Sequence, residues 1–158
     1  MPLRKTRKIH IGKLVIGGDS PIAIQSMAAT QTQDLTATSR QIEVLEKANA
    51  DIIRIAVDNE KDVEALKILR EKFPESTWSV DLQENYKLAP MVAPWVDKIR
   101  YNPGHLFHLE KDKSIREKVQ FIVEAARKNE CALRIGVNCG SVDPDYKEKY
   151  QDDSTEAM

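Results

Sequence analysis

The chain has 158 residues, of which 41% are hydrophobic and 31% are charged, a composition that suits one globular domain with a core of its own. It contains 24 Lys and Arg residues and 25 Asp and Glu residues, so positive and negative charges nearly balance. The surface therefore offers no basic field for nucleic acid and no polybasic membrane anchor. No apolar run is long enough to span a bilayer, and the basic stretch 1–8 lacks the hydrophobic segment of a signal peptide. We therefore expect a cytoplasmic protein that binds neither nucleic acid nor membranes.

Strand and helix patterns alternate along the chain. Residues 8–11 and 14–16 predict a β-hairpin that turns at Gly12-Lys13. Later strands, the first of them expected to be buried, are predicted at residues 22–27, 52–57, 77–82, 96–101 and 133–138. Helices are predicted at about 35–49 after an Asp34 cap, from Asp58 to Phe73, at 86–93 closed by Pro94, at 115–126 and at 146–150. This alternation indicates an α/β fold with parallel strands and right-handed crossovers, either a doubly wound sheet or an eight-stranded barrel.

The number of strands is small for a closed barrel. Five βα strands follow the hairpin, whereas a (β/α)8 barrel of the TIM type takes typically about 250 residues. We therefore expect residues 1–158 to be the amino-terminal part of a TIM-type barrel domain from a longer protein.

Three predicted strands each carry one arginine between large apolar residues. These are Arg54, Arg100 and Arg134, and the pattern places them at equivalent strand positions. Side chains alternate faces along a strand, so each arginine shares a face with the residue two positions later. Because an unpaired guanidinium is costly to bury, three of them require carboxylates or a multiply charged anion as partners. We interpret the set as a phosphate-binding clamp, against the alternative that each arginine forms an ion pair or snorkels to solvent from an edge strand.

Polar side chains stand near the carboxyl ends of the same strands, where parallel α/β folds bind their ligands. Asn102 and Asn138 supply amides that could orient a hydroxylated, phosphorylated small molecule. Asp81 could pair with an arginine or act as a catalytic acid or base, and of the two we favour the structural role.

Other catalytic signatures are missing from the sequence. It contains no G-x-G-x-x-G, P-loop, nucleophile elbow or H-E-x-x-H motif. Cys131 and Cys139 lack the spacing of a disulfide framework or a zinc site, and we expect Cys131 to be a buried thiol. The histidines, His10, His105 and His108, are expected on the surface. The sequence therefore predicts no metal site.

Several motifs resemble the amino-terminal part of the hydroxymethylbutenyl diphosphate synthase family, over nearly the whole chain and in the same order. They are Arg4-Lys5-Thr6-Arg7, Gly17-Gly18, Ile24-Gln25-Ser26-Met27, Lys98-Ile99-Arg100-Tyr101-Asn102-Pro103-Gly104 and Arg134-Ile135-Gly136-Val137-Asn138-Cys139-Gly140-Ser141. The resemblance implies reductive ring opening of 2-C-methyl-D-erythritol 2,4-cyclodiphosphate in the methylerythritol phosphate pathway of isoprenoid synthesis. It also implies that Arg54, Arg100, Asn102, Arg134 and Asn138 bind the diphosphate and hydroxyl groups of this substrate.

The resemblance further implies a homodimer, flavodoxin or ferredoxin as electron donor, and a 4Fe-4S cluster held by a carboxyl-terminal domain. Neither cysteine of this chain matches a cluster ligand, so we expect the 158-residue chain alone to be inactive. Where the family usually has Asp-Ile-His-Phe, this chain has Asp81-Leu82-Gln83-Glu84, which alters a histidine position near the substrate.

Two other functions are compatible with the same pattern. A pterin-binding synthase is also a phosphate-binding barrel with arginines and asparagines at its strand ends. A non-catalytic fragment could instead bind a partner chain through the open edge of its sheet.

Overall fold

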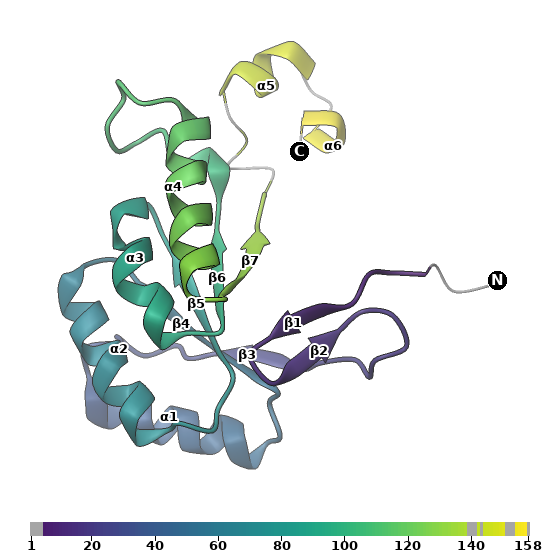
Figure 1. Ribbon diagram of the computed structural model, residues 1–158. Helices are drawn as coiled ribbons and strands as arrows, with labels where there is room; N and C mark the ends of the chain where they lie inside the picture. Colours follow the sequence, from purple (N-terminus) through teal and green to yellow (C-terminus); the bar gives the residue numbers. More distant parts are fainter. Residues whose placement is uncertain (1–4, 139–141, 143, 151–153, 158) are drawn as a thin grey trace.

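The computed structural model describes residues 5–138, 142, 144–150 and 154–157 (Figure 1). The strands are β1 Ile9–Ile11, β2 Leu14–Ile16, β3 Gln25–Met27, β4 Ile52–Val57, β5 Trp78–Leu82, β6 Lys98–Tyr101 and β7 Ala132–Ile135. The α-helices are α1 Leu35–Lys47, α2 Glu60–Lys72, α3 Ala89–Val92, α4 Ile115–Lys128, α5 Pro144–Tyr150 and α6 Ser154–Ala157. Short 3-10 helices are η1 Tyr86–Leu88, η2 Ala93–Trp95 and η3 Pro103–His105. None of the helices described is long and apolar enough to cross a membrane.

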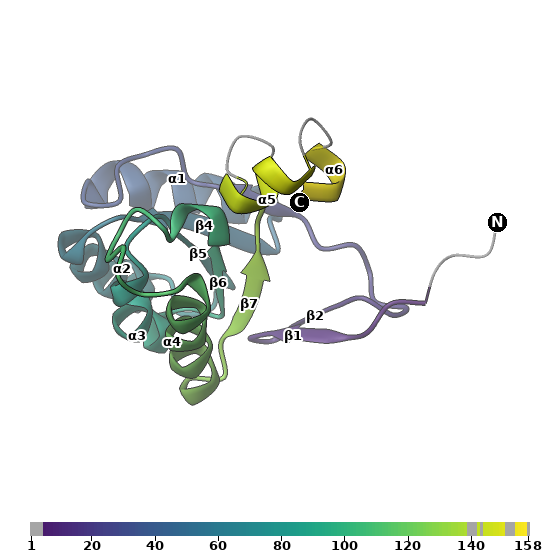
Figure 2. The same ribbon diagram turned by 90° about the horizontal axis from the view of Figure 1, so that it is seen from above.

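The strands form two sheets. β1 and β2 make an antiparallel hairpin, and the other five strands make a parallel sheet in the order β3-β4-β5-β6-β7. Helices α1 to α4 lie on one side of the parallel sheet and the hairpin lies on the other (Figure 2). Sequential parallel strands with helical crossovers on one side are the arrangement of a TIM-type barrel, so the predicted fold class is confirmed as a partial barrel.

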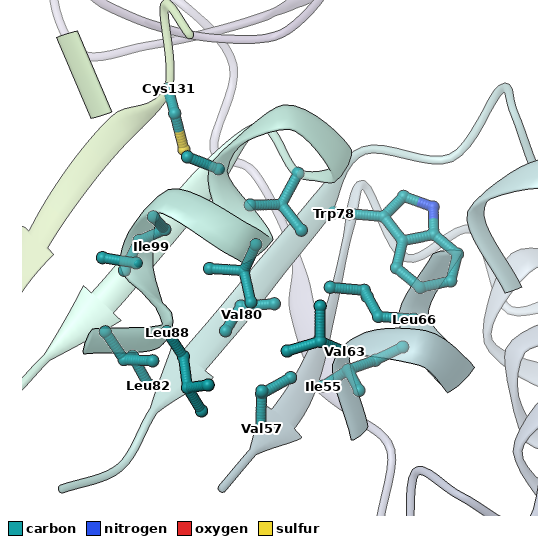
Figure 3. Close-up of a cluster of buried hydrophobic side chains, with 14 of the residues drawn as sticks. Ile55, Val57, Val63, Leu66, Trp78, Val80, Leu82, Leu88, Ile99 and Cys131 are labelled. Carbon is teal, nitrogen blue, oxygen red and sulfur yellow. The ribbon is translucent and has the colours of Figure 1, made fainter. Parts of the chain in front are cut away.

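The hydrophobic core fills the space between the parallel sheet and its helices. Ile55, Val80 and Ile99 from neighbouring strands lie in one cluster with Val63 and Leu66 of α2 (Figure 3). These strand residues are at most 1% exposed. Because side chains alternate along each strand, the residues between them point to the opposite face of the sheet, away from the helices. That opposite face corresponds to the interior of the partial barrel.

Side-chain caps fix where the three long helices begin. The Asp34 carboxylate accepts a hydrogen bond from the Ala37 amide at the start of α1, as the sequence predicts. The cap of α2 is Asn59, one residue later than the predicted start at Asp58. The backbone amide of Asp58 donates a hydrogen bond to the Asp62 carboxylate. Asn59 prevails because it forms a reciprocal capping box with Asp62, which satisfies two backbone donors together.

Two further sequence predictions need correction. Residues 22–27 were expected to form a buried strand, but β3 is only three residues long, and Ile22 and Ile24 are 94% and 59% exposed. β3 lies at one edge of the described sheet, so only one of its sides is paired. The helix expected to close at Pro94 continues to Trp95, because Pro94 occupies the first turn of η2, where no amide donor is needed.

Candidate functional site

The barrel-facing side of the parallel sheet carries two transverse rows of residues that pair in register. The first, called here the Asp81 row, consists of Ala56, Asp81, Arg100 and Arg134. The second, the Lys98 row, lies two residues earlier on each strand and consists of Met27, Arg54, Ser79, Lys98 and Ala132. Strands β4 to β7 therefore bring four cations and one carboxylate onto this face, whereas the opposite face is apolar.

Asp81 is the charge partner of two of the predicted arginines. Its side chain is 4% exposed, and its two carboxylate oxygens accept hydrogen bonds from different strands. Arg54 Nη2 donates to Oδ2, and Arg100 Nη1 donates to Oδ1 at 3.0 Å. A carboxylate shared by two guanidinium groups neutralises only one of their charges, so the pairing keeps both arginines ordered and leaves excess positive charge.

The three arginines are not equivalent, which corrects the prediction. Arg100 and Arg134 are register partners in the Asp81 row. Arg54 lies in the Lys98 row, and Ala56 occupies the position beside Asp81 on β4. Arg54 still reaches Asp81 because its long side chain spans the distance between rows. Arg134 was expected to be buried and is exposed, because β7 is the other edge of the described sheet and pairs only with β6.

Lys98 is a site residue that the sequence reasoning missed. It is 6% exposed, and its ammonium group donates a 2.6 Å hydrogen bond to Oε1 of Gln25, across the barrel-facing side from β6 to β3. Burial lowers the pKa of Lys98 to about 8, with further lowering by the positive charges of Arg134 and Arg54. The sequence could have identified Lys98, since Lys98 and Arg100 are two residues apart in one strand and therefore lie on the same face of the sheet.

Two buried polar atoms of the Lys98 row have no hydrogen-bond partner in the part of the chain that the structure describes. They are Nε of Arg54 and Oγ of Ser79, whose residues are register partners on adjacent strands. Ser79 is 0% exposed. Buried polar atoms are normally paired, so an unpaired donor beside an unpaired hydroxyl indicates a place for a ligand atom or a bound water.

The carboxyl ends of β4 and β5 border a cavity of about 500 Å³. Asp58 and Gln83 line it from the loops that follow these strands, and His108 lines it from the loop after β6. Loss of hydration raises the pKa of Asp58, helped by the neighbouring carboxylates of Asp62, Asp81 and Glu84. His108 is exposed, as predicted, but it also borders this cavity.

The predicted asparagines lie at the same end of the sheet. Asn102 is 1% exposed, and its side-chain oxygen accepts the Gly104 amide hydrogen at 3.0 Å, which shapes the turn into η3. Asn138 follows β7 and is exposed. Cys139, Gly140 and Ser141 lie outside the described residues.

A second cavity of about 720 Å³ separates the hairpin from the barrel-facing side of the sheet. Ile9 and Ile11 of β1 line one wall, and Gln25, Lys98 and Arg134 line the other. Two residues of the Lys98 row, Lys98 and Ala132, therefore border this cavity.

The described residues do not fit an iron-sulfur cluster. No group of three or more His, Cys, Asp or Glu side chains among them could hold a metal ion. Cys131 is a buried free thiol, as predicted, and burial raises its pKa to about 12, so it is not a thiolate near neutral pH. Because cysteine ligands bind a cluster as thiolates, Cys131 is unsuited to that role.

Known proteins share this sequence over nearly its whole length. The family model described as the GcpE TIM-barrel domain matches residues 6–158. The 4-hydroxy-3-methylbut-2-en-1-yl diphosphate synthase (flavodoxin) of Rhodopirellula baltica is 53% identical over 95% of this chain and 39% of its own length. Synthases of the same name from Acidithiobacillus ferrooxidans and Helicobacter pylori are each 41% identical, over 98% and 92% of the chain and 40% and 38% of their own lengths.

The chain thus spans about two fifths of the length of the curated relatives it matches. A match to almost every residue, together with a partial barrel whose interior face is cationic, gives a single assignment. The chain belongs to the GcpE TIM-barrel domain family, whose relatives include the 4-hydroxy-3-methylbut-2-en-1-yl diphosphate synthases.

Proposed function

We propose that this chain supplies the diphosphate-binding part of a 4-hydroxy-3-methylbut-2-en-1-yl diphosphate synthase. The substrate would be 2-C-methyl-D-erythritol 2,4-cyclodiphosphate, whose reductive ring opening gives the product named in the relatives. The observation that carries the proposal is the charge of the barrel-facing side, where Asp81 is the one carboxylate against four cations on strands β4 to β7. Such an excess of fixed donors suits a small ligand with several negative charges.

In this proposal the arginines bind phosphoryl oxygens. Arg134 makes no ion pair with any described carboxylate, so its guanidinium fork is available to an anion. Arg100 and Arg54 are held by Asp81 and present their remaining N–H donors. Asn102 and Asn138 orient the hydroxylated part of the substrate at the carboxyl ends of the strands. The contacts of Asp81 support a positioning role rather than direct proton transfer.

The electrons come from elsewhere in the complete enzyme. Reductive loss of a hydroxyl takes a redox cofactor, which in the full-length family is a 4Fe-4S cluster. We infer that flavodoxin supplies the electrons, because the relatives carry that donor in their names. We further propose that residues 1–158 are the amino-terminal part of the barrel domain of a cytoplasmic homodimer. The 158-residue chain alone should yield no product with a reduced dye and the cyclic diphosphate.

Calorimetric titration of the 158-residue chain with pyrophosphate tests the binding role. Arg134→Ala should weaken binding about tenfold or more, since hydrogen bonds to charged groups contribute about 1.5–3 kcal/mol. Arg134→Lys keeps the charge but loses the two-pronged geometry of the guanidinium group, so its pyrophosphate affinity should lie between those of the parent chain and Arg134→Ala. Arg127→Ala is the matched control, because Arg127 is exposed on α4, on the helix-covered side of the sheet. Equal affinity of the parent chain, Arg100→Ala and Arg134→Ala would exclude the proposed site.

A further inference from the structure

The Lys98 row contains polar groups that no interaction among the described residues satisfies. Ser79 lies between Arg54 and Lys98 in register, so the three side chains project side by side from β4, β5 and β6. Ser79 and Lys98 are 0% and 6% exposed. Ser79 Oγ and Arg54 Nε are without a hydrogen-bond partner among the described residues, although each is fully buried as an atom. A buried hydroxyl and a buried N–H that stay unpaired destabilise the fold, so a ligand that pairs with both is bound the more tightly.

We propose that Ser79, Lys98 and Nε of Arg54 form a second anion subsite, which binds a phosphoryl oxygen one row below the Asp81 row. This inference rests on the proposed function and adds Ser79 and Lys98 to the residues that hold the diphosphate. Two phosphoryl groups joined by one oxygen present acceptors at more than one depth, which matches two rows of donors on one face.

The chemistry of the row favours an anionic oxygen over water. Arg54 Nε and the Lys98 ammonium can only donate, and Ser79 can donate as well. The Lys98 ammonium gives one hydrogen bond to Gln25, which leaves two of its three protons for other acceptors. A water molecule would bring two protons into a row that already holds more donors than acceptors. An oxygen with negative charge accepts from all three groups and offsets their charge.

Anion binding at this subsite is coupled to the protonation of Lys98. Polar and charged groups from every strand of the sheet share the barrel-facing side with Lys98: Gln25 from β3, Arg54 from β4, Asp81 from β5, Arg100 from β6 and Arg134 from β7. The hairpin wall opposite consists of apolar side chains such as Ile9 and Ile11. Burial and the charges of Arg134 and Arg54 lower the pKa of Lys98 to about 8. A bound anion opposes both effects, so it raises the pKa, and binding above pH 8 takes up a proton.

The first test compares affinities for pyrophosphate at pH 7, measured by calorimetry on the 158-residue chain. Ser79→Ala and Lys98→Met should each weaken binding by about tenfold, since each removes one hydrogen bond to a charged partner. Lys13→Met is the control, because Lys13 is an exposed lysine of the hairpin turn that pairs with Glu75. Circular dichroism of each variant verifies that the fold is retained.

The second test follows the pH dependence with sulfate, a tetrahedral anion whose own charge does not change between pH 7 and pH 10. The affinity of the parent chain should fall above pH 8 by up to about tenfold per pH unit, as Lys98 loses its proton. Lys98→Arg keeps its charge throughout and should bind sulfate with no such slope, while Lys98→Met should bind weakly at every pH.

The outcomes separate the two proposals. If Arg134→Ala abolishes pyrophosphate binding while Ser79→Ala and Lys98→Met bind like the parent chain, the second subsite is wrong and the proposed function stands. The second subsite is also wrong if the parent chain and Lys98→Met bind sulfate with the same affinity at pH 7, because the anion then makes no contact with Lys98. If the parent chain binds no pyrophosphate at all, both proposals fail.

Discussion

The guanidinium group of Arg100 occupies the space that Gly136 leaves open by having no side chain. A Cβ atom at position 136 would lie 2.8 Å from Cζ of Arg100 and nearer still to Nε, closer than real Cβ contacts come. The backbone cannot simply retreat, because the Gly136 amide donates a 2.9 Å hydrogen bond to the carbonyl oxygen of Tyr101. The glycine after β7 therefore sets the position of an arginine on β6, which in turn is held by Asp81.

Gly136→Ala should displace Arg100 from Asp81. Overpacking of a filled site destabilises proteins typically by about 1–3 kcal/mol, and the displaced guanidinium would also lower pyrophosphate affinity. Chemical denaturation and calorimetry measure the two effects. The double variant with Arg100→Ala is the control, because the clash then has no partner: Gly136→Ala should have little effect on stability in that background. An equal loss of stability with and without Arg100 would disprove the steric argument.

Asp81→Asn should destabilise the fold by about 3 kcal/mol, the lower end of the roughly 3–5 kcal/mol found when one member of a buried ion pair is removed. The carboxylate is 4% exposed and separates two guanidinium groups, whose mutual repulsion the amide would not offset. Urea denaturation measures the loss. Asp112→Asn provides a control, because Asp112 is exposed in the loop before α4. A change below about 0.5 kcal/mol for Asp81→Asn, similar to the control, would show that the pairs contribute little.

The sequence predicted the fold well because periodicity reports burial directly. The hairpin, the five parallel strands and the helices α1, α2 and α4 follow from apolar spacing and capping residues, and the structure confirms them. Burial at the two sheet edges was not predictable, since exposure of Ile24 and Arg134 depends on which strands pair, and not on local pattern.

The candidate site was predictable in part, for a related reason. Asp81 was expected to pair with an arginine, and the structure pairs it with both Arg54 and Arg100. Lys98 was missed because its importance comes from burial and from Gln25, a partner 73 positions earlier in the chain. Register decides such contacts, and a one-residue slip between strands would separate them. The binding roles of the arginines and asparagines stay predictions.

Ser114→Ala should lower the free energy of unfolding by about 1 kcal/mol, the usual effect of losing a helix cap. Ser114 Oγ accepts from the Glu117 amide at 3.2 Å, and the Ser114 amide donates to the Glu117 carboxylate at 2.8 Å. Hydrogen bonds from Ser114 lower the pKa of Glu117. The stabilisation that depends on the ionised Glu117 carboxylate is therefore present above the ordinary pKa of a glutamate and is lost as the pH falls through the lowered value. Ser114→Asp keeps a capping oxygen and should retain most of the stability in thermal denaturation. Equal losses for both substitutions would rule out the cap as the cause.

Lys98 should make the protein more stable as the pH rises. Its pKa is lowered from 10.5 to about 8 in the folded chain, so between these values the unfolded chain holds a proton that the folded chain has released. The unfolded state binds more protons there, and the free energy of unfolding consequently increases with pH. A shift of this size corresponds to about 3 kcal/mol, which is the amount by which the buried charge destabilises the fold at pH 7.

Lys98→Met tests this relation, because methionine is similarly long, unbranched and uncharged. We expect the variant to be more stable than the parent chain at pH 7, by up to about 3 kcal/mol less the contribution of the lost hydrogen bond to Gln25. The difference should shrink between pH 8 and pH 10 as Lys98 becomes neutral in the folded parent chain. Urea denaturation at several pH values measures both quantities, and Lys13→Met serves as the control because Lys13 is exposed. A stability difference between Lys98→Met and the parent chain that stays constant across this range would mean that Lys98 keeps its ordinary pKa on the barrel-facing side.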